Sequence, residues 1–322
     1  MKLAFFYAVN KMRIVFMGTP NAAVPTLERI MLDGHEVAAV YTQPDRPSGR
    51  GNKIAFSPIK EFALEKGLIV LQPLKIRTAE AIETFRSHKA DVAVVVAYGR
   101  ILPEVFLNTF PMGAINVHFS LLPKYRGAAP VNWAIVNGEN ETGVTTMRMD
   151  AGLDTGAILL QKTMVIGGDE TAIDLMERLS LSGAELLSET LTNLEHLEPT
   201  PQENDMATYA PILKREDGLI DWGLSAVEIA NRMRGFQPFP TAFTYFNQMR
   251  LTLCRARPQW FEYDRKFVSG EVLEAGGGKI LVGCGDGSVL SIEELQLEGK
   301  RRLQTPDFLN GVKLLLGEVF GE

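Results

Sequence analysis

The sequence predicts an α/β protein, in which a doubly wound, mostly parallel sheet is followed by a small C-terminal β-barrel. Two observations predict this order. From Met12 to Asn193, apolar runs alternate with segments whose apolar residues recur at helical spacing, as in βαβ units. In the last third, short alternating runs are separated by glycine-rich turns, as in small barrels. The 322 residues also exceed what one core usually serves, so we expect two domains.

Apolar runs predict the strands of the first domain. The run from Met12 is closed by a Gly18-Thr19-Pro20 turn, and the run at 91–97 is rich in valine, as expected for a strand covered on both faces. A Tyr98-Gly99 turn ends that run, and we expect a ligand crevice there, beside the next strand. The strands are expected at 12–17, 35–42, 68–71, 91–97, 114–117, 142–150 and 158–166.

Helical spacing of apolar residues predicts the intervening helices. The longest, at 171–193, has Asp169 or Thr171 as its expected N-cap. No GxGxxG follows the first strand, so a dinucleotide cofactor is not indicated. The helices are expected at 22–32, 59–66, 79–87, 130–137 and 171–193.

The polar, proline-containing stretch after the long helix predicts a domain boundary. We expect a catalytic domain at 1–193, a linker at 194–210 and a barrel domain at 211–322. Because the first strand follows Met12 directly, residues 1–11 are expected to be an upstream-start extension. The barrel domain is expected to contain a helix at 225–234, strands at 242–246, 249–257, 270–274, 279–282 and 289–297, and a final helix at 305–316.

Composition excludes several classes of protein. With 46% hydrophobic and 22% charged residues, this is the composition of an ordinary globular protein. No stretch reaches the roughly 18 to 20 apolar residues of a membrane span, and Leu3–Val9 is too short for a convincing signal peptide. Two cysteines indicate reduced thiols in the cytoplasm rather than a disulfide framework. A net charge of −6 argues against a generally basic nucleic-acid coat but not against a local basic groove.

The candidate site lies where the strand at 114–117 meets its loop. Asn116 and His118 are two residues apart, so they can point to one face at the carboxyl end of a strand, where open parallel sheets bind ligands. A lone histidine near a strand end is more often a hydrogen-bonded structural residue than a catalyst. Its surroundings favour catalysis here, because Asp154 follows in a turn flanked by glycines.

The stretch Asn-x-His-x-Ser-Leu-Leu-Pro-x-Tyr-Arg-Gly at 116–127, with Ala-Gly-Leu-Asp-Thr-Gly at 151–156, resembles the signature of formyltransferases that use 10-formyltetrahydrofolate. The resemblance implies a Rossmann-like catalytic domain in which Asn116, His118 and Asp154 act without a metal. It also implies that the segment Ser120, Leu121, Leu122 and Pro123 contacts the folate. Phe119 departs from the pattern, because the relatives carry a small residue there, and it is expected to affect the shape of the folate pocket.

Across both domains the chain resembles the family members that act on methionyl initiator tRNA, which implies RNA as a partner and a monomeric enzyme. The loop at 43–53, rich in Pro, Gly and positive charge, lies where the family places the tRNA acceptor end. This nominates Arg46, Arg50 and Lys53, above all Arg50. Lys214 and Arg215, just after the linker, are further phosphate candidates. Taken alone, the loop fits a solvated surface loop, and the Lys-Arg pair fits an ordinary exposed pair equally well.

Three other functions fit parts of the sequence. N-formylation of an amino-sugar nucleotide would use the same three polar residues, but no epimerase or decarboxylase domain is attached. A catalytically idle RNA-binding module is disfavoured by the intact Asn116, His118 and Asp154. A folate hydrolase, with water in place of the amine, would need no basic loop.

Overall fold

The computed structural model describes residues 11–48, 53–260 and 265–321. The chain forms two compact units, which are described separately. The first contains Met1–Gly127, Glu141–Val165 and Met176–Tyr209, and the second contains Ala128–Asn140, Ile166–Leu175 and Ala210–Glu322. Two segments that precede residue 193 in the sequence, Ala128–Asn140 and Ile166–Leu175, therefore belong to the second unit.

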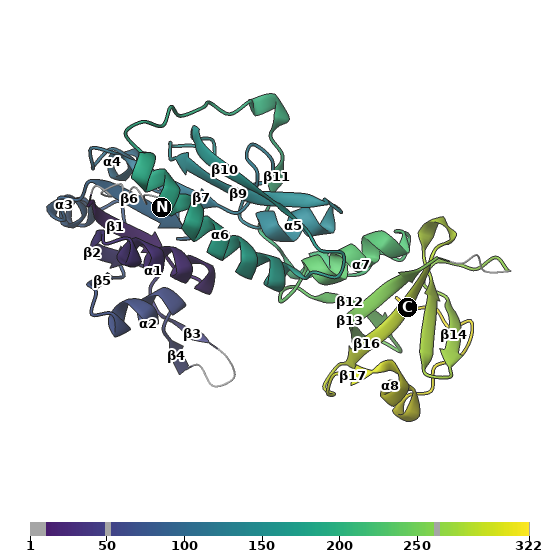
Figure 1. The fold of residues 1–322 in the computed structure, drawn as a ribbon. Coiled ribbons are helices and arrows are strands. Elements are labelled where there is room, and N and C mark those ends of the chain that lie inside the picture. The colour runs from purple at the N-terminus through teal and green to yellow at the C-terminus, as the bar shows by residue number, and fades with distance from the viewer. Residues whose placement is uncertain (1–10, 49–52, 261–264, 322) are drawn as a thin grey trace, which may run out of the picture. The chain divides into compact units, whose positions relative to one another are not determined.

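A seven-stranded sheet organises the first unit (Figure 1). Its order is β10-β9-β7-β6-β1-β2-β5. In this order, the strands from β7 to β5 are parallel to one another, whereas β9 pairs in antiparallel fashion with both β7 and β10. The predicted doubly wound, mostly parallel sheet is thus confirmed. The strands are β1 (Arg13–Gly18), β2 (Glu36–Tyr41), β5 (Val70–Leu71), β6 (Val92–Val96), β7 (Ala114–His118), β9 (Glu141–Arg148) and β10 (Ile158–Val165).

Helices flank this sheet. On one face, Phe85 of α3 stacks on Phe106 of α4 with ring centroids 4.2 Å apart, within a cluster that includes Val15 and Val95 of the central strands. The helices of the first half are α1 (Val24–Leu32), α2 (Pro58–Glu65), α3 (Ala79–Ser87), α4 (Glu104–Leu107), α5 (Pro130–Val136) and α6 (Ala172–Asn193), with the short 3-10 helix η1 (Asn21–Ala23) before α1. Of these, α5 belongs to the second unit.

The helix α6 packs closely on the strands that carry the site. A Cβ placed on Gly183 would lie 2.9 Å from Val117 Cγ1, so only glycine permits this approach. The Thr171 hydroxyl accepts a hydrogen bond from the backbone N–H of Asp174 (3.3 Å), which makes Thr171 the N-cap, one of the two expected.

The expected loop at 43–53 contains two short strands. β3 (Arg46–Ser48) and β4 (Lys53–Ala55) pair in antiparallel register and form a ribbon. Sequence reasoning also missed α4 and three further short strands, β8 (Arg126–Gly127), β11 (Tyr209–Ala210) and β17 (Leu303–Gln304). Strands of two or three residues carry too little alternation to be recognised.

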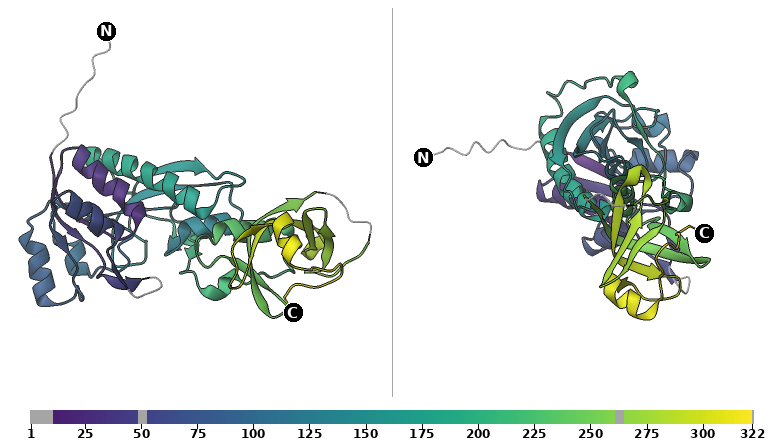
Figure 2. Two further views of the ribbon diagram at one scale, coloured as in Figure 1. Left: turned by 90° about the horizontal axis from the view of Figure 1, so that it is seen from below. Right: turned by 90° about the vertical axis from the view of Figure 1, so that its right-hand side faces the viewer.

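The second unit contains an antiparallel sheet of order β12-β13-β16-β15-β14, with β17 paired to β16, which confirms the sheet expected for the C-terminal domain (Figure 2). Its core includes Trp222, whose indole donates to the Thr244 hydroxyl (3.1 Å). The elements are α7 (Ala226–Gly235), β12 (Ala242–Phe246), β13 (Met249–Gln259), β14 (Val272–Gly276), β15 (Lys279–Gly283), β16 (Val289–Leu297), β17 (Leu303–Gln304) and α8 (Thr305–Gly311), with 3-10 helices η2 (Asn204–Met206) in the first unit and η3 (Arg215–Gly218) and η4 (Gly285–Gly287) in the second.

One helix prediction was wrong at its end. The final helix was expected to reach Leu316, but α8 ends at Gly311, and Val312 is extended with φ −130° and ψ 120°. Glycine and β-branched valine both disfavour continuing a helix. Beyond them, Leu314 is buried in the core of the second unit, and this tertiary packing overrides the helical spacing.

Candidate active site

Asn116 and His118 lie at the carboxyl end of β7, between β6 and β9 in the sheet. Both are buried, with 8% and 6% of their surface exposed. Their spacing of two places their side chains on the same face of the strand. Within the part of the chain that the structure describes, the Asn116 carboxamide has no hydrogen-bond partner, so it remains available to a ligand.

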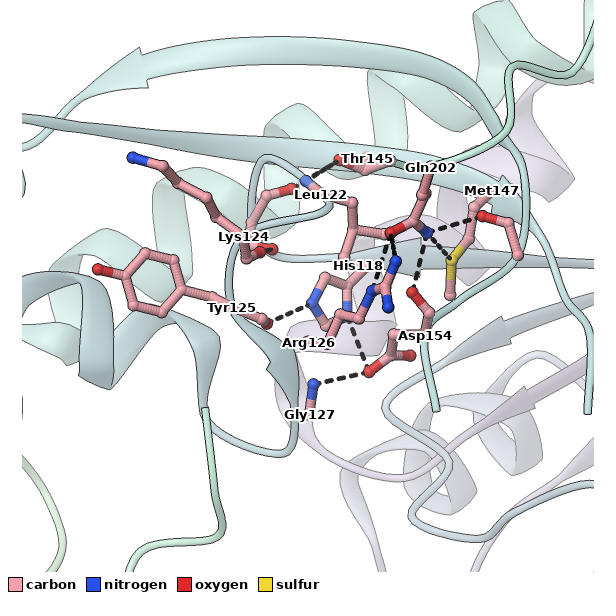
Figure 3. A network of polar contacts seen from close by, with 12 residues as sticks. His118, Leu122, Lys124, Tyr125, Arg126, Gly127, Thr145, Met147, Asp154 and Gln202 are labelled. Carbon is pink, nitrogen blue, oxygen red and sulfur yellow. Dashed lines mark hydrogen bonds and ion pairs between the residues drawn. The ribbon is translucent and has the colours of Figure 1, made fainter. Parts of the chain in front are cut away.

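Both ring nitrogens of His118 face acceptors (Figure 3). Nε2 lies 3.0 Å from the backbone carbonyl of Tyr125, which can only accept, so Nε2 carries a hydrogen. Nδ1 lies 3.8 Å from Oδ2 of Asp154. Because Nε2 is held as a donor, Nδ1 is the nitrogen that can gain or lose a proton, and it does so beside a carboxylate.

The turn that carries Asp154 has a demanding backbone. Asp154 has φ +54°, in the left-handed region. A Cβ on Gly156 would lie 1.7 Å from the backbone oxygen of Arg148, so this position requires glycine. The Asp154 carboxylate is fixed from the other side, because its Oδ2 accepts the backbone N–H of Gly127 at 2.8 Å. The structure therefore brings all three predicted catalytic residues, Asn116, His118 and Asp154, to one end of the sheet.

The predicted folate segment, 120–123, is held by Thr145 of β9. The Thr145 hydroxyl donates to the Ser120 carbonyl (2.7 Å) and accepts the Leu122 N–H (3.1 Å). Ser120 and Leu122 are buried, whereas Leu121 and Pro123 are half-buried. The Ser120 hydroxyl already donates to the Lys124 carbonyl (2.7 Å). Surface for a ligand is thus offered by Leu121, Pro123 and the backbone rather than by the Ser120 hydroxyl.

Phe119 lies on the other side of the strand from His118. Its ring is 3.4 Å from the position that a Cβ on Gly183 of α6 would occupy, and the side chain is buried. Any influence of Phe119 on the site is therefore transmitted through the packing of α6.

Sequence reasoning missed Arg126, although it stands within the signature stretch. Only 2% of its surface is exposed, and its guanidinium donates to Gln202 Oε1 and Asn204 Oδ1 within 3.0 Å. An arginine fixed within the signature stretch was the available signal, since a buried arginine must be fully paired.

The predicted RNA-binding residues fall in both units. Arg46 is exposed at the start of β3, Lys53 begins β4, and Arg50 lies outside the described residues. Lys214 and Arg215 are exposed at the start of η3 in the second unit.

The base of the β3–β4 ribbon is clamped by α2. Lys60 Nζ forms an ion pair with Asp45 Oδ2, donates to Gln72 Oε1 (2.9 Å) and lies 3.8 Å from the centroid of the Phe56 ring. Asp45 precedes the ribbon and Phe56 follows it, so one ammonium group contacts both ends. Hydrogen bonds from Lys60 and then Gln72 lower the pKa of the Asp45 carboxyl group.

The described residues contain no group of three His, Cys, Asp or Glu side chains that could hold a metal ion. In the same part of the chain, no helix is both long and apolar enough to span a membrane.

Two family models match the chain. The family model "Formyl transferase" matches residues 12–191, and "Formyl transferase, C-terminal domain" matches residues 212–313. A doubly wound sheet with Asn116 and His118 at a strand end thus belongs to an enzyme of the formyl transferase class.

Curated relatives narrow this class. Methionyl-tRNA formyltransferase of Geobacter sulfurreducens is 50% identical over 97% of both chains, and that of Acetivibrio thermocellus is 46% identical over 97% of this chain and all of its own. The chain belongs to the methionyl-tRNA formyltransferase family.

Solved structures show the same fold at low identity. WlaRD, a sugar 3N-formyl transferase crystallised with dTDP and 5-N-formyl-THF, has a TM-score of 0.63 at 23% identity and covers 90% of this chain and 99% of its own. HypX from Aquifex aeolicus in complex with tetrahydrofolic acid has a TM-score of 0.62 at 20% identity, over 95% of this chain and 50% of its own.

Proposed function

We propose that this enzyme transfers the formyl group of 10-formyltetrahydrofolate to the α-amino group of methionyl initiator tRNA. The observation that carries the proposal is His118, held between the Tyr125 carbonyl and the Asp154 carboxylate, two residues from the unpaired carboxamide of Asn116. The identity of about half the residues with named relatives across both units supports the choice of RNA acceptor.

The chemistry demands oxyanion stabilisation more than a strong base. A free α-amino group has a pKa of about 7.7 to 8.0, so a useful fraction is neutral and nucleophilic at physiological pH. Attack on the formyl carbon places negative charge on its oxygen, and a proton must pass from the incoming to the leaving nitrogen. Asn116 has a free amide N–H with which to bind that oxygen.

His118 supplies positive charge and a mobile proton beside the same oxygen. Its Nε2–H is committed to Tyr125, so the proton that moves is the one at Nδ1. Asp154 stabilises the doubly protonated ring and takes part in removing the proton from the amine. Because Gly127 donates to the Asp154 carboxylate, the carboxylate is oriented before substrate binds.

The donor side fits a folate through shape rather than through charged groups. Leu121 and Pro123 offer apolar surface beside His118, and Ser120 and Leu122 hold this segment in place through Thr145. Ser120, Leu121, Leu122 and Pro123 together thus form the proposed folate-contacting segment.

In the proposal, five cations recognise the tRNA acceptor: Arg46, Arg50 and Lys53 of the sequence stretch 43–53, and Lys214 and Arg215 near η3. If Arg50 contacts a phosphate, Arg50→Ala lowers the slope of log affinity against log salt by about one and raises KM for tRNA. Filter binding of charged tRNA across salt concentrations measures the slope. A slope equal to that of the unmodified enzyme removes Arg50 from the interface. Glu65→Ala, on the exposed end of α2, is a control that changes charge without removing a cation.

The deciding experiment offers radiolabelled 10-formyltetrahydrofolate with four acceptors in parallel: methionyl initiator tRNA, uncharged tRNA, glycinamide ribonucleotide and a 4-amino-sugar nucleotide. Label on the charged tRNA alone supports the whole proposal. Label on a small amine keeps the catalytic residues and overturns the RNA acceptor, and release of formate without transfer indicates a hydrolase. We also propose that the enzyme is a monomer and that it is cytoplasmic. The two free cysteines support the cytoplasmic location.

A further inference from the structure

Gln202 comes from the stretch expected to be a featureless linker, yet its side chain lies inside the catalytic network (Figure 3). It is half-buried, and it belongs to the first unit together with His118, Asp154 and Arg126. The side chain of an ordinary linker residue stays in water, so the hydrogen bonds of the Gln202 side chain indicate its role.

The Gln202 carboxamide is hydrogen-bonded at both ends. Its Oε1 accepts from Arg126 Nε (3.0 Å) and from a terminal guanidinium nitrogen of Arg126 (2.8 Å). Its Nε2 donates to the backbone carbonyls of Asp154 (2.9 Å) and Gly156 (2.7 Å). Arg126 requires a hydrogen-bond acceptor, and the two carbonyls require a group that donates two hydrogen bonds. Among uncharged side chains, only a carboxamide provides both.

These bonds close a ring around the Asp154 carboxylate. From the Asp154 carbonyl the ring passes through Gln202 to the Arg126 side chain, along the backbone to the N–H of Gly127, and back to Asp154 Oδ2 (2.8 Å). Asp154 has a left-handed backbone, which is strained for a residue other than glycine. Without Gln202, the turn at Asp154 and the Arg126–Gly127 segment that orients its carboxylate are no longer hydrogen-bonded to one common side chain.

We propose that Gln202 is a positioning residue, which holds the Asp154 turn so that the carboxylate faces Nδ1 of His118. It acts on the reaction through Asp154 and touches neither substrate. This inference rests on the catalytic roles given above for His118 and Asp154, but not on the identity of the acceptor.

The test uses Gln202→Glu, which keeps the acceptor for Arg126 but loses both donors and sets a carboxylate against two carbonyl oxygens. We expect kcat to fall by about 10- to 100-fold, in line with the cost of a small misplacement of a catalytic group, with KM for both substrates little changed. Glu203→Gln is the control, because Glu203 is the exposed neighbour of Gln202 and, within the described residues, its side chain makes no hydrogen bond or ion pair. Its kcat should stay within about twofold of the unmodified enzyme.

A second readout needs no substrate. The His118 ring, followed by NMR in the free enzyme through selectively labelled histidine, should titrate differently in Gln202→Glu and as in the unmodified enzyme in Glu203→Gln. If Gln202→Glu does not fold, Gln202→Ala is measured in the same way. An unchanged titration, or a loss of activity confined to KM, overturns the positioning role. If kcat is lost for whichever amine the unmodified enzyme formylates and the titration changes, the inference stands even where the RNA acceptor is wrong.

Discussion

Two buried histidines at opposite ends of the strands of one sheet have different surroundings, and only one of them fits the catalytic role that we propose. His35 and His118 are each 6% exposed. His35 lies just before β2, at the amino ends of the parallel strands, and His118 ends β7 at their carboxyl ends. Burial alone therefore says nothing about their roles.

The difference lies in what each ring faces. His35 Nδ1 accepts the backbone N–H of Met12 at 3.1 Å, and its buried Nε2 has no hydrogen-bond partner among the residues that the structure describes. Burial lowers the pKa of His35, against a smaller opposing influence of Asp33. His118, by contrast, has an acceptor at each nitrogen. The first arrangement favours a neutral, packed imidazole, and the second has the geometry that the proposed proton transfer requires.

The largest expected effect breaks this comparison directly. His118→Asn should lower kcat by about 100- to 1,000-fold, because it removes the charge and proton beside the developing oxyanion. His35→Asn, an equal change at an equally buried site, should leave kcat near its original value in the folded enzyme. Steady-state formyl transfer measures both. Near-normal turnover of a folded His118→Asn enzyme would mean that this histidine is structural as well.

A smaller effect tests whether His118 works as a pair with Asp154. Asp154→Asn removes the negative charge 3.8 Å from Nδ1 and should itself slow turnover by about 100-fold. Residues that act as a unit are strongly non-additive, so His118→Asn combined with Asp154→Asn should be little slower than the slower single variant. Single-turnover rates give the coupling. If the two losses multiply, the residues act independently and Asp154 has another role.

The sequence predicted the elements well wherever the signal was local. The helix α3 has the bounds expected from its apolar spacing, and Asn116 and His118 fall on one face because strand alternation requires it. The end of α8 was missed because burial of Leu314 in the core decides it.

The site's supporting residues could not be read from any local pattern. The partners of Gln202 lie between 46 and 76 residues away along the chain, and the polar residues around it carry no period. The glycine-flanked turn drew attention to Asp154, but a carboxylate between glycines fits many turns, so its role depended on the family resemblance. What brings Asp154 to His118 is the pairing of β7 with β9, which is tertiary information.

The smallest expected effect concerns His35 and pH. In the unfolded chain His35 titrates near 6.5, and in the folded protein its pKa is lower, so below about pH 6.5 the unfolded state binds more protons. The free energy of unfolding of the first unit should therefore fall as pH drops from 7.5 to 5.5, by at most about 1.4 kcal/mol per pH unit from this group. The pKa of His88 is also lowered, by burial and then by Arg13, and acts in the same direction. Urea unfolding at several pH values measures the slope, and His35→Asn, which keeps an acceptor for Met12, should flatten it. If His35→Asn leaves the slope unchanged, His35 is not a neutral, packed residue, and its contrast with His118 fails.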